Sequence, residues 1–275
     1  LRGVSDVGVT VAGGKGKASR KTPAEIETAC DRLGLDAAPL VRASRLSAKV
    51  DSSAVQDGFA VYHHAFVFTD GGEWGVVQQG MNEDTGMARR YHWLTTSRFD
   101  ADPHAAVVGE SGRQVLNLVA AEAESNRDVA AALARDHPDG VVHEVAHMRT
   151  LSMPRRHHVR ADDLDPERLR RVLISASEAQ PKTYEDLLAV KGVGAKGLRA
   201  LSLVAEVTYG EPASIRDPVS FSFAHGGKDG TPYPVDRATY DSTIESLRTA
   251  LREAKAGRTE KVDALKRLAR LETQG

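Results

Sequence analysis

The sequence predicts an α+β protein, with a mixed α/β part over residues 1–110 that contains an antiparallel β-hairpin sheet and an all-α part over residues 111–275. Three observations lead to this fold class. Before residue 110, β-branched and aromatic side chains surround one strong turn signal. After it, Ala- and Leu-rich segments repeat with helical periodicity. A chain of 275 residues is also long enough to bury one large core or two smaller ones.

The first elements that we expect are two helices, over residues 23–33 and 38–49. Thr22 and Glu25 match a capping box at the start of the first helix, and Pro23 suits its first turn. The Gly- and Lys-rich stretch just before them lacks the spacing of a phosphate-binding Walker loop. We therefore expect that stretch to be a flexible basic arm.

A β-hairpin is predicted next, because the stretch FAVYHHAFVFTDGGEWGVVQQGM is β-branched and aromatic on both sides of Asp-Gly-Gly-Glu. With Gly71 and Gly72 as the loop, His64 faces Gln79 on the neighbouring strand. Directly opposed residues share one face of a sheet, so these two side chains would lie together. The stretch RRYHWLTTS, residues 89–97, predicts a further strand.

The second half of the chain is predicted to be helical. An Ala-rich periodic run covers residues 113–135. Proline or a capping side chain marks the start of the later helices. We expect one helix opened by Asp165 and Pro166, one opened by Thr183, and two charged amphipathic helices over residues 238–271.

The stretch YEDLLAVKGVGAKGLRALSLVAEV reads as helix, Gly-Val-Gly, helix, which is the helix-hairpin-helix pattern, over about residues 183–210. Glycines let the turn tighten and let backbone N–H groups approach a phosphate. The second helix then points its positive N-terminus at the same oxygens. The other interpretation is an αα-hairpin whose glycines only make the turn. The predicted DNA-binding residues are Lys191, Gly192, Val193, Gly194, Lys196, Arg199, and Lys15 and Lys17 of the basic arm.

A catalytic alternative also begins at this hairpin. The glycine turn and the stretch YGEPASIRD that follows its second helix are together similar to helix-hairpin-helix DNA glycosylases. Those enzymes carry a catalytic Lys just after Gly-x-Gly, then a Gly-Pro stretch and an Asp. The resemblance implies a glycosylase or AP lyase that uses Lys196 and Asp217. The segment between Lys196 and Gly210 is about one helical turn longer than in those enzymes. Such a lysine must be desolvated or lie near like charge to provide a free amine at neutral pH.

A different cluster on the predicted sheet suits phosphodiester chemistry, in which a metal or histidine activates water and arginines hold the charge on phosphorus. The alternative is a structural polar ladder on a half-buried sheet. Asp57 and His64 would hold a divalent metal, Mn²⁺ or Mg²⁺. The predicted catalytic residues are His64, Gln79, Asp57, Arg89, Arg90 and His92.

Two further histidine clusters are candidates for other chemistry. The stretch HEVAH matches a zincin pattern, with His143 and His147 one helical turn apart and Glu144 as a base. The more ordinary interpretation is two histidines on a short amphipathic segment. The stretch PRRHHVR, residues 154–160, would contact phosphate or lend a histidine to the site, or is a solvated linker.

Composition limits the class of protein. The formal net charge is -1, from 37 basic and 38 acidic side chains, so any polyanion site must come from local clustering. The single cysteine, Cys30, excludes an internal disulfide framework and fits a reducing cytoplasm. No apolar run approaches the length of a membrane span, and there is no signal peptide. The chain begins at Leu1 rather than Met, so we expect a processed or truncated start.

Four blocks together resemble the family catalogued as domain of unknown function 763. The resemblance covers nearly the whole chain, and it implies no particular activity because the family's function is unassigned. The blocks are VAGGKGKASRKTP, YHHAFVFTDGGEWGVVQQGMNEDTGMARRYHW, SMPRRHH and DPVSFSFAHGGKDGTPYPVDR.

These observations favour a cytoplasmic DNA-processing protein, a metal-dependent DNA nuclease acting in repair. The first alternative is the glycosylase or AP lyase that uses Lys196 and Asp217. The second is a DNA-binding protein without catalytic activity, in which the hairpin sheet is structural. DNA is the expected partner in all three, and no membrane is involved.

Overall fold

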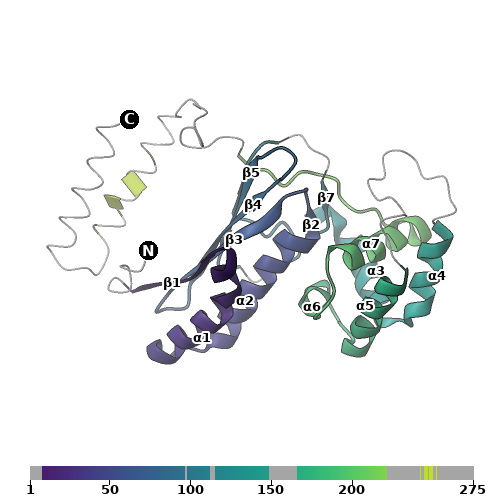
Figure 1. The fold of residues 1–275 in the computed structure, drawn as a ribbon, viewed down its shortest axis with the longest axis horizontal. Helices are drawn as coiled ribbons and strands as arrows, with labels where there is room; N and C mark the ends of the chain where they lie inside the picture. The colour runs from purple at the N-terminus through teal and green to yellow at the C-terminus, as the bar shows by residue number, and fades with distance from the viewer. Residues whose placement is uncertain are drawn as a thin grey trace.

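The computed structural model describes residues 8–96, 98–111, 115–148 and 166–221, together with six isolated positions between 242 and 252, and it is mixed α/β (Figure 1). The strands are β1 (Val9–Lys15), β2 (Val55–Gln56), β3 (Ala60–Thr69), β4 (Trp74–Met81), β5 (Ala88–Leu94), β6 (Ala106–Val108) and β7 (Leu116–Asn117). The α-helices are α1 (Thr22–Leu33), α2 (Ala37–Lys49), α3 (Glu124–Arg135), α4 (Pro138–Met148), α5 (Pro166–Ala179), α6 (Tyr184–Ala189) and α7 (Ala195–Tyr209). Two 3-10 helices, η2 (Gly16–Lys21) and η4 (Ala121–Ala123), and a π-helical turn, η3 (Val50–Ala54), connect them.

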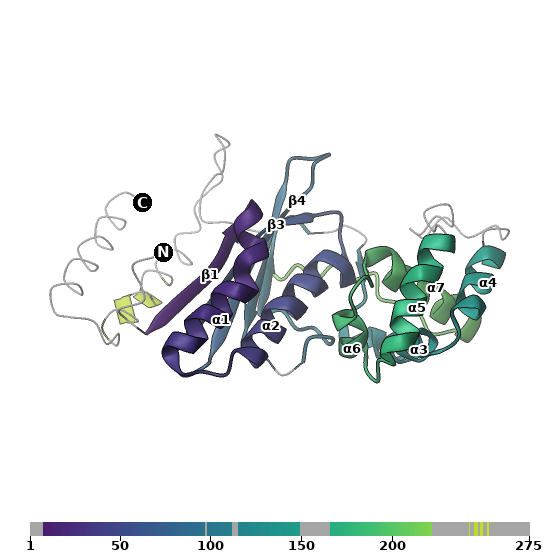
Figure 2. The ribbon, with the colours of Figure 1, turned by 60° about the horizontal axis from the view of Figure 1, so that its bottom comes forward.

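Five strands form one antiparallel sheet in the order β1-β3-β4-β5-β6. Helices α1 and α2 lie side by side against one of its faces (Figure 2). Alternate side chains of the strands therefore point into the layer between sheet and helices. Phe66 stacks on Trp74 there, and Trp74 and Trp93 both stack on Phe99, with ring centroids 5.6–5.9 Å apart. This aromatic cluster fills the core under α2.

The start of α1 differs from the predicted capping box. Helix α1 begins at Thr22 without a side-chain cap, and the Glu25 carboxylate instead accepts a hydrogen bond from the Gly13 N–H at 2.7 Å. Gly13 has a φ of 87°, and a Cβ built on it would collide with the Thr22 side chain and the His64 carbonyl oxygen. Glycine is required here because β1 passes so close to α1 and β3.

The prediction of a flexible basic arm is wrong for the residues that the structure describes. Residues 9–15 form the edge strand β1, which pairs with β3, and residues 16–21 form η2. The cause is the open edge of β3, which offers backbone hydrogen bonds to the Val-rich start of the segment. Lys15 and Lys17 are exposed at the end of β1 and in η2.

The predicted hairpin is present, but its register is shifted by one residue. The loop has three residues, Asp70-Gly71-Gly72, rather than Gly71-Gly72 alone, because the Thr69 N–H donates to the Glu73 carbonyl at 2.9 Å and Thr69 therefore lies opposite Glu73. His64 therefore lies opposite Gln78, and Gln79 lies opposite His63. A slip of one residue exchanges the two faces of a strand, so Gln79 does not share a face with His64.

The helix predicted over residues 113–135 is wrong in its first half. Residues 116–117 form β7, which pairs with β2, and α3 begins only at Glu124. The Leu118 N–H donates to the Ala54 carbonyl, and the Arg127 guanidinium binds the Leu118 carbonyl. These tertiary contacts take the backbone groups that a helix would need, and they override the helix propensity of the run.

The two helices predicted to open at Pro166 and Thr183 are present as α5 and α6. Helix α6 has a full capping box, formed by Thr183 and Asp186. The amphipathic helices predicted over residues 238–271 lie almost wholly outside the described residues.

After α7 the chain returns to the N-terminal part, in a stretch that we call the return segment (residues 211–221). Ser214 bridges to Asn117 of β7, and Phe221 bridges to Val108 of β6. The Phe221–Val108 bridge and the β2–β7 pair cross the predicted division at residue 110, which stays a prediction. Among the described residues, no helix has the length and apolar character needed to cross a membrane.

Candidate functional site

The predicted catalytic residues lie on two opposite faces of the sheet. Arg89 of β5 is fully buried on the helix-covered face, whereas the next residue, Arg90, is exposed on the other face. His64 is also buried on the covered face, while Gln79 and His92 alternate with the buried residues of β4 and β5. The predicted cluster is therefore two separate groups of residues, one buried on the helix-covered face and one on the opposite face.

His64 belongs to a buried chain of hydrogen bonds. Its Nε2 atom lies 2.9 Å from the Ser44 hydroxyl, and its Nδ1 atom lies 2.9 Å from Oε1 of Gln78. Nε2 of Gln78 donates to the Ser47 carbonyl, which can only accept, so Oε1 of Gln78 must face His64. His64 thus carries its proton on Nδ1, and Ser44 donates to Nε2. Burial lowers the pKa of His64, which keeps the ring neutral.

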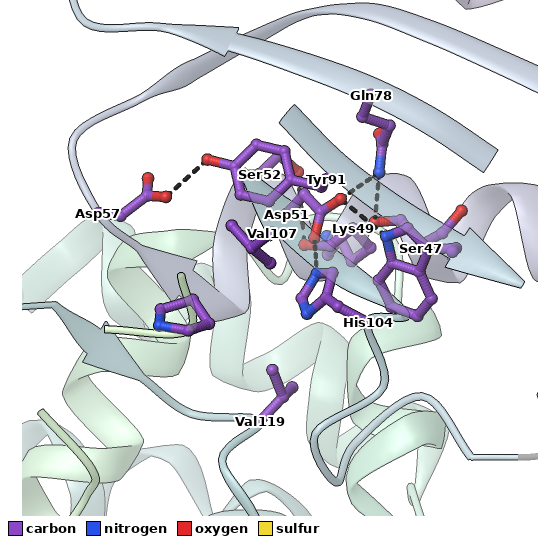
Figure 3. A network of polar contacts seen from close by, with 12 residues as sticks. Ser47, Lys49, Asp51, Ser52, Asp57, Gln78, Tyr91, His104, Val107 and Val119 are labelled. Carbon is purple, nitrogen blue, oxygen red and sulfur yellow. Dashed lines mark hydrogen bonds and ion pairs between the residues drawn. The ribbon is translucent and has the colours of Figure 1, made fainter. Parts of the chain in front are cut away.

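This chain continues to Asp51, a fully buried carboxylate in the π-helical turn η3 (Figure 3). Gln78 and the indole N–H of Trp93 both donate to Oδ2 of Asp51, the indole at 2.9 Å. Nε2 of His104 lies 2.6 Å from Oδ1. Asp51 and His104 were missed in the sequence, because they lie outside the strands and only folding brings them to Gln78.

Asp57 and Arg89 form a second buried group. Oδ2 of Asp57 accepts from the Arg89 guanidinium at 2.9 Å and from the Tyr91 hydroxyl at 2.6 Å, and Oδ1 accepts from the Phe59 N–H. Arg89 also pairs with Asp217 of the return segment at 3.0 Å. Burial raises the pKa of Asp57, while Tyr91 and Arg89 lower it. Burial also raises the pKa of Tyr91, which keeps the phenol protonated as a donor.

These contacts favour a structural role for both predicted metal ligands. Asp57 and His64 are each at least 90% buried and bonded to protein groups on all their polar atoms. Over the described ranges, no group of three or more His, Cys, Asp or Glu residues is arranged to hold a metal ion. Binding of Mn²⁺ or Mg²⁺ by these residues stays a prediction.

The zincin pattern lies on α4, with His143 and His147 both exposed to solvent and Glu144 partly buried. Neither histidine is part of a three-ligand group in the described residues. The basic stretch at residues 154–160 lies outside the described residues.

The second group of predicted residues lies on the face of the sheet that α1 and α2 do not cover, which we call the open face. The register places Lys15, His63, Gln79 and Arg90 in one row across β1, β3, β4 and β5. His92 lies two residues further along β5 on the same face. Gln79, Arg90 and His92 are thus brought together, as the sequence predicts, but without His64, Asp57 and Arg89.

The Gly-Val-Gly stretch makes a tight turn between α6 and α7. Gly192 has a φ of 93°, and side chains built at Gly192 or Gly194 would meet nothing within 4 Å. Val193 is buried, which fixes the turn on the helical core, while Lys191 and Lys196 are exposed. Gly194 is the N-cap of α7, and no side chain caps that helix. The turn therefore presents free backbone N–H groups and two ammonium groups on its open side.

The N-terminal part supports the turn from behind. Lys49 at the end of α2 donates to the Val193 carbonyl oxygen, and burial lowers the pKa of this lysine. The Gln56 side chain donates to the Ala195 carbonyl at 2.9 Å and accepts from Arg199 Nε at 2.6 Å. Arg199, a predicted DNA contact, thus faces β2, and its guanidinium helps to hold the turn in place.

The two residues of the lyase alternative have separate surroundings. Lys196 is exposed in the first turn of α7. Asp217 pairs with Arg89 and also accepts from the Val219 N–H at 3.1 Å. No hydrogen bond or ion pair joins Lys196 to Asp217 in the part of the chain that the structure describes, so their joint catalytic role stays a prediction.

The fold and these sites define a mixed α/β protein, in which α1 and α2 cover one face of an antiparallel sheet and the α6–α7 turn presents two exposed lysines. The chain belongs to the family described as protein of unknown function (DUF763), whose family model matches residues 2–235. This match confirms the resemblance seen in the sequence. No curated protein and no solved structure matches the chain.

Proposed function

We propose that this protein binds DNA and holds the phosphate backbone at the α6–α7 turn as a helix-hairpin-helix. The observation that carries the proposal is the open turn around Gly192, where Lys191 and Lys196 flank the uncapped N-terminus of α7. Backbone N–H groups at a helix N-terminus bind anions, and the helix dipole adds to that attraction. Such contacts position a protein on DNA without reading its sequence.

The support of the turn by the N-terminal part fits this role. Lys49 and Gln56 hold the Val193 and Ala195 carbonyls, so the backbone around the turn is fixed before a phosphate arrives. A rigid site loses less entropy on binding than a mobile one. Arg199 contributes through the same contacts, by its hydrogen bond to Gln56.

Metal-dependent hydrolysis of DNA, in repair, is a second candidate function. The observation that favours it is the shared position of Gln79, Arg90 and His92 on the open face, where arginine and imidazole would meet a phosphodiester. The metal would come from solution or with the substrate. The lyase alternative has less support, because Lys196 is exposed to solvent and Asp217 is paired with Arg89.

The binding proposal is tested with fluorescence anisotropy of a labelled DNA duplex. Lys196→Glu should weaken binding about tenfold, because one phosphate contact is lost and a repulsive charge is added. Lys182→Glu is the matched control, since Lys182 is exposed just before α6, at the opposite end of that helix from the turn. Equal affinities for the two variants would refute a phosphate contact at the turn.

The catalytic candidates are tested by incubating labelled single-stranded, duplex and abasic DNA with Mn²⁺ or Mg²⁺, and again with a chelator. Cutting that needs metal and fails in Arg90→Ala would support hydrolysis at the open face. Cutting that survives the chelator, is confined to abasic strands and fails in Lys196→Ala would support the lyase. Intact DNA in every reaction, with binding retained, would leave a DNA-binding protein without catalytic activity.

A further inference from the structure

The strands that form the open face carry basic side chains and no acidic ones. The five strands of the sheet contain no Asp or Glu at any position, although the whole chain has almost equal numbers of acidic and basic side chains. Lys15, His63 and Arg90 lie in one row across this face, and His92 lies beside the row. A surface that has basic and imidazole groups and lacks carboxylates attracts a polyanion.

The same face also presents apolar side chains to solvent. Val77 is 40% exposed, Met81 42% and Leu94 66%. Two small residues lie beside them on the same face, Ala65 opposite Val77 and Gly75 opposite Leu94. Helices α1 and α2 pack on the other face (Figure 2).

One polar atom on this face has no partner. Nε2 of His92 is shielded from solvent and makes no hydrogen bond. Burial and the neighbouring Arg90 lower the pKa of His92, so its ring is neutral and one nitrogen is left unsatisfied. Because this nitrogen is shielded from solvent, it offers no contact to a ligand on the open face unless the ring turns, and binding there depends on the exposed groups of the face.

We propose that the open face binds a short segment of single-stranded DNA, with phosphates along the row from Lys15 to Arg90 and bases against the histidines and the exposed apolar side chains. Neighbouring strands are about 4.8 Å apart, so this row spans roughly 14 Å. That length suits a few nucleotides of an extended strand. A duplex hides its base faces, whereas a single strand can stack its bases on imidazole, guanidinium and apolar groups.

The main rival occupant is the chain's own C-terminal stretch. Residues 238–275 contain eight basic and six acidic side chains, so their net charge has the same sign as that of the open face. Charge complementarity therefore favours DNA over this segment. The inference rests on the proposed DNA-binding function and adds a second, strand-specific surface to it.

The test compares single-stranded and duplex DNA in anisotropy measurements with two charge reversals. Arg90→Glu should weaken single-strand binding roughly tenfold and leave duplex binding within about twofold of wild type. Arg45→Glu is the matched control, because Arg45 is exposed on α2, on the opposite side of the sheet. Lys196→Glu should have its main effect on the duplex.

These outcomes separate the two proposals. If Arg90→Glu and Arg45→Glu bind the single strand equally well, the open-face proposal is wrong, whatever happens at the α6–α7 turn. If only Lys196→Glu has no effect, the turn is not the duplex contact and the open face still stands. Tighter binding of RNA than of DNA with the same sequence would overturn the choice of DNA.

A second measurement shows whether the face is free. Gln79→Cys places a thiol in the middle of the row, and the natural cysteine, Cys30, is buried. This thiol should react quickly with a maleimide in the free protein and slowly with the oligonucleotide bound. A thiol that is unreactive in the free protein would show that the chain itself covers the face, and would overturn the proposal.

Discussion

Replacing Arg89 with methionine tests whether the buried ion group holds the two halves of the chain together. Arg89 is fully buried, and its guanidinium bonds Asp57 at 2.9 Å, Asp217 at 3.0 Å and the Glu110 carbonyl at 2.9 Å. Methionine has a similar length and no charge. The Arg89→Met variant therefore removes the cation and leaves two carboxylates that are 1% and 9% exposed.

The expected loss follows from those two uncompensated charges. Removing one partner of a buried ion pair costs about 3–5 kcal/mol. Asp57 keeps its bonds to Tyr91 and the Phe59 N–H, and Asp217 keeps the Val219 N–H, so we expect the lower half of that range. A second change, Asp57→Asn, should recover part of the loss, because it removes one of the unpaired charges.

The assay is urea unfolding at neutral pH, followed by circular dichroism. The matched control is Arg90→Met, since Arg90 is the next residue and lies exposed on the other face of the sheet. Its free energy of unfolding should stay within about 0.5 kcal/mol of wild type. A loss below about 1 kcal/mol in Arg89→Met would refute the stabilising role of the buried ion group. Equal losses in both variants would refute the assignment of Arg89 and Arg90 to opposite faces of the sheet.

Two further predictions concern stability. The pKa of His64 is lowered in the folded protein, so the unfolded chain binds this proton more tightly, and stability is lost as the pH falls below the ordinary value of about 6.5. The free energy of unfolding should fall by up to about 1.4 kcal/mol per pH unit more steeply in wild type than in His64→Gln between pH 6.5 and 5; parallel curves would contradict this. Gly13→Ala should lower the free energy of unfolding by more than about 2 kcal/mol, because the added Cβ would collide with the Thr22 side chain and the His64 carbonyl oxygen. Gly34→Ala is the control, since Gly34 has a φ of 71° and open space around it, and it should cost only about 1 kcal/mol in the same urea assay. Equal losses would show that the close approach of β1 is not a constraint.

Local patterns in the sequence were sufficient to predict most elements. Helices α1, α2, α5 and α6 begin within a residue or so of their predicted starts, because capping residues and proline act on the adjacent backbone. The hairpin was predicted but not its register, since the three-residue loop depends on a backbone bond between Thr69 and Glu73. The helix predicted from residue 113 failed because β2 and the return segment bind that stretch.

The candidate site was harder to predict, for a related reason. Arg89 and Arg90 are neighbours in the sequence, yet the two-residue period of a strand sends them to opposite faces. Their separation follows from the predicted strand alone, but which of the two is buried becomes predictable only once one face is known to be covered. Two partners of the buried groups, Asp51 and His104, come from distant segments that have no motif of their own, and Asp217 was singled out only for a different role.

The measurement that tests the central claim most directly is the salt dependence of duplex binding. Each phosphate contact contributes about 0.9 to the slope of log affinity against log salt concentration. If Lys191 and Lys196 hold phosphates at the α6–α7 turn, replacing both with alanine should lower the slope by about 1.8, while Lys182→Ala should leave it unchanged. An unchanged slope in the double variant, or no duplex binding by wild type at low salt, would contradict the proposal that this turn holds DNA.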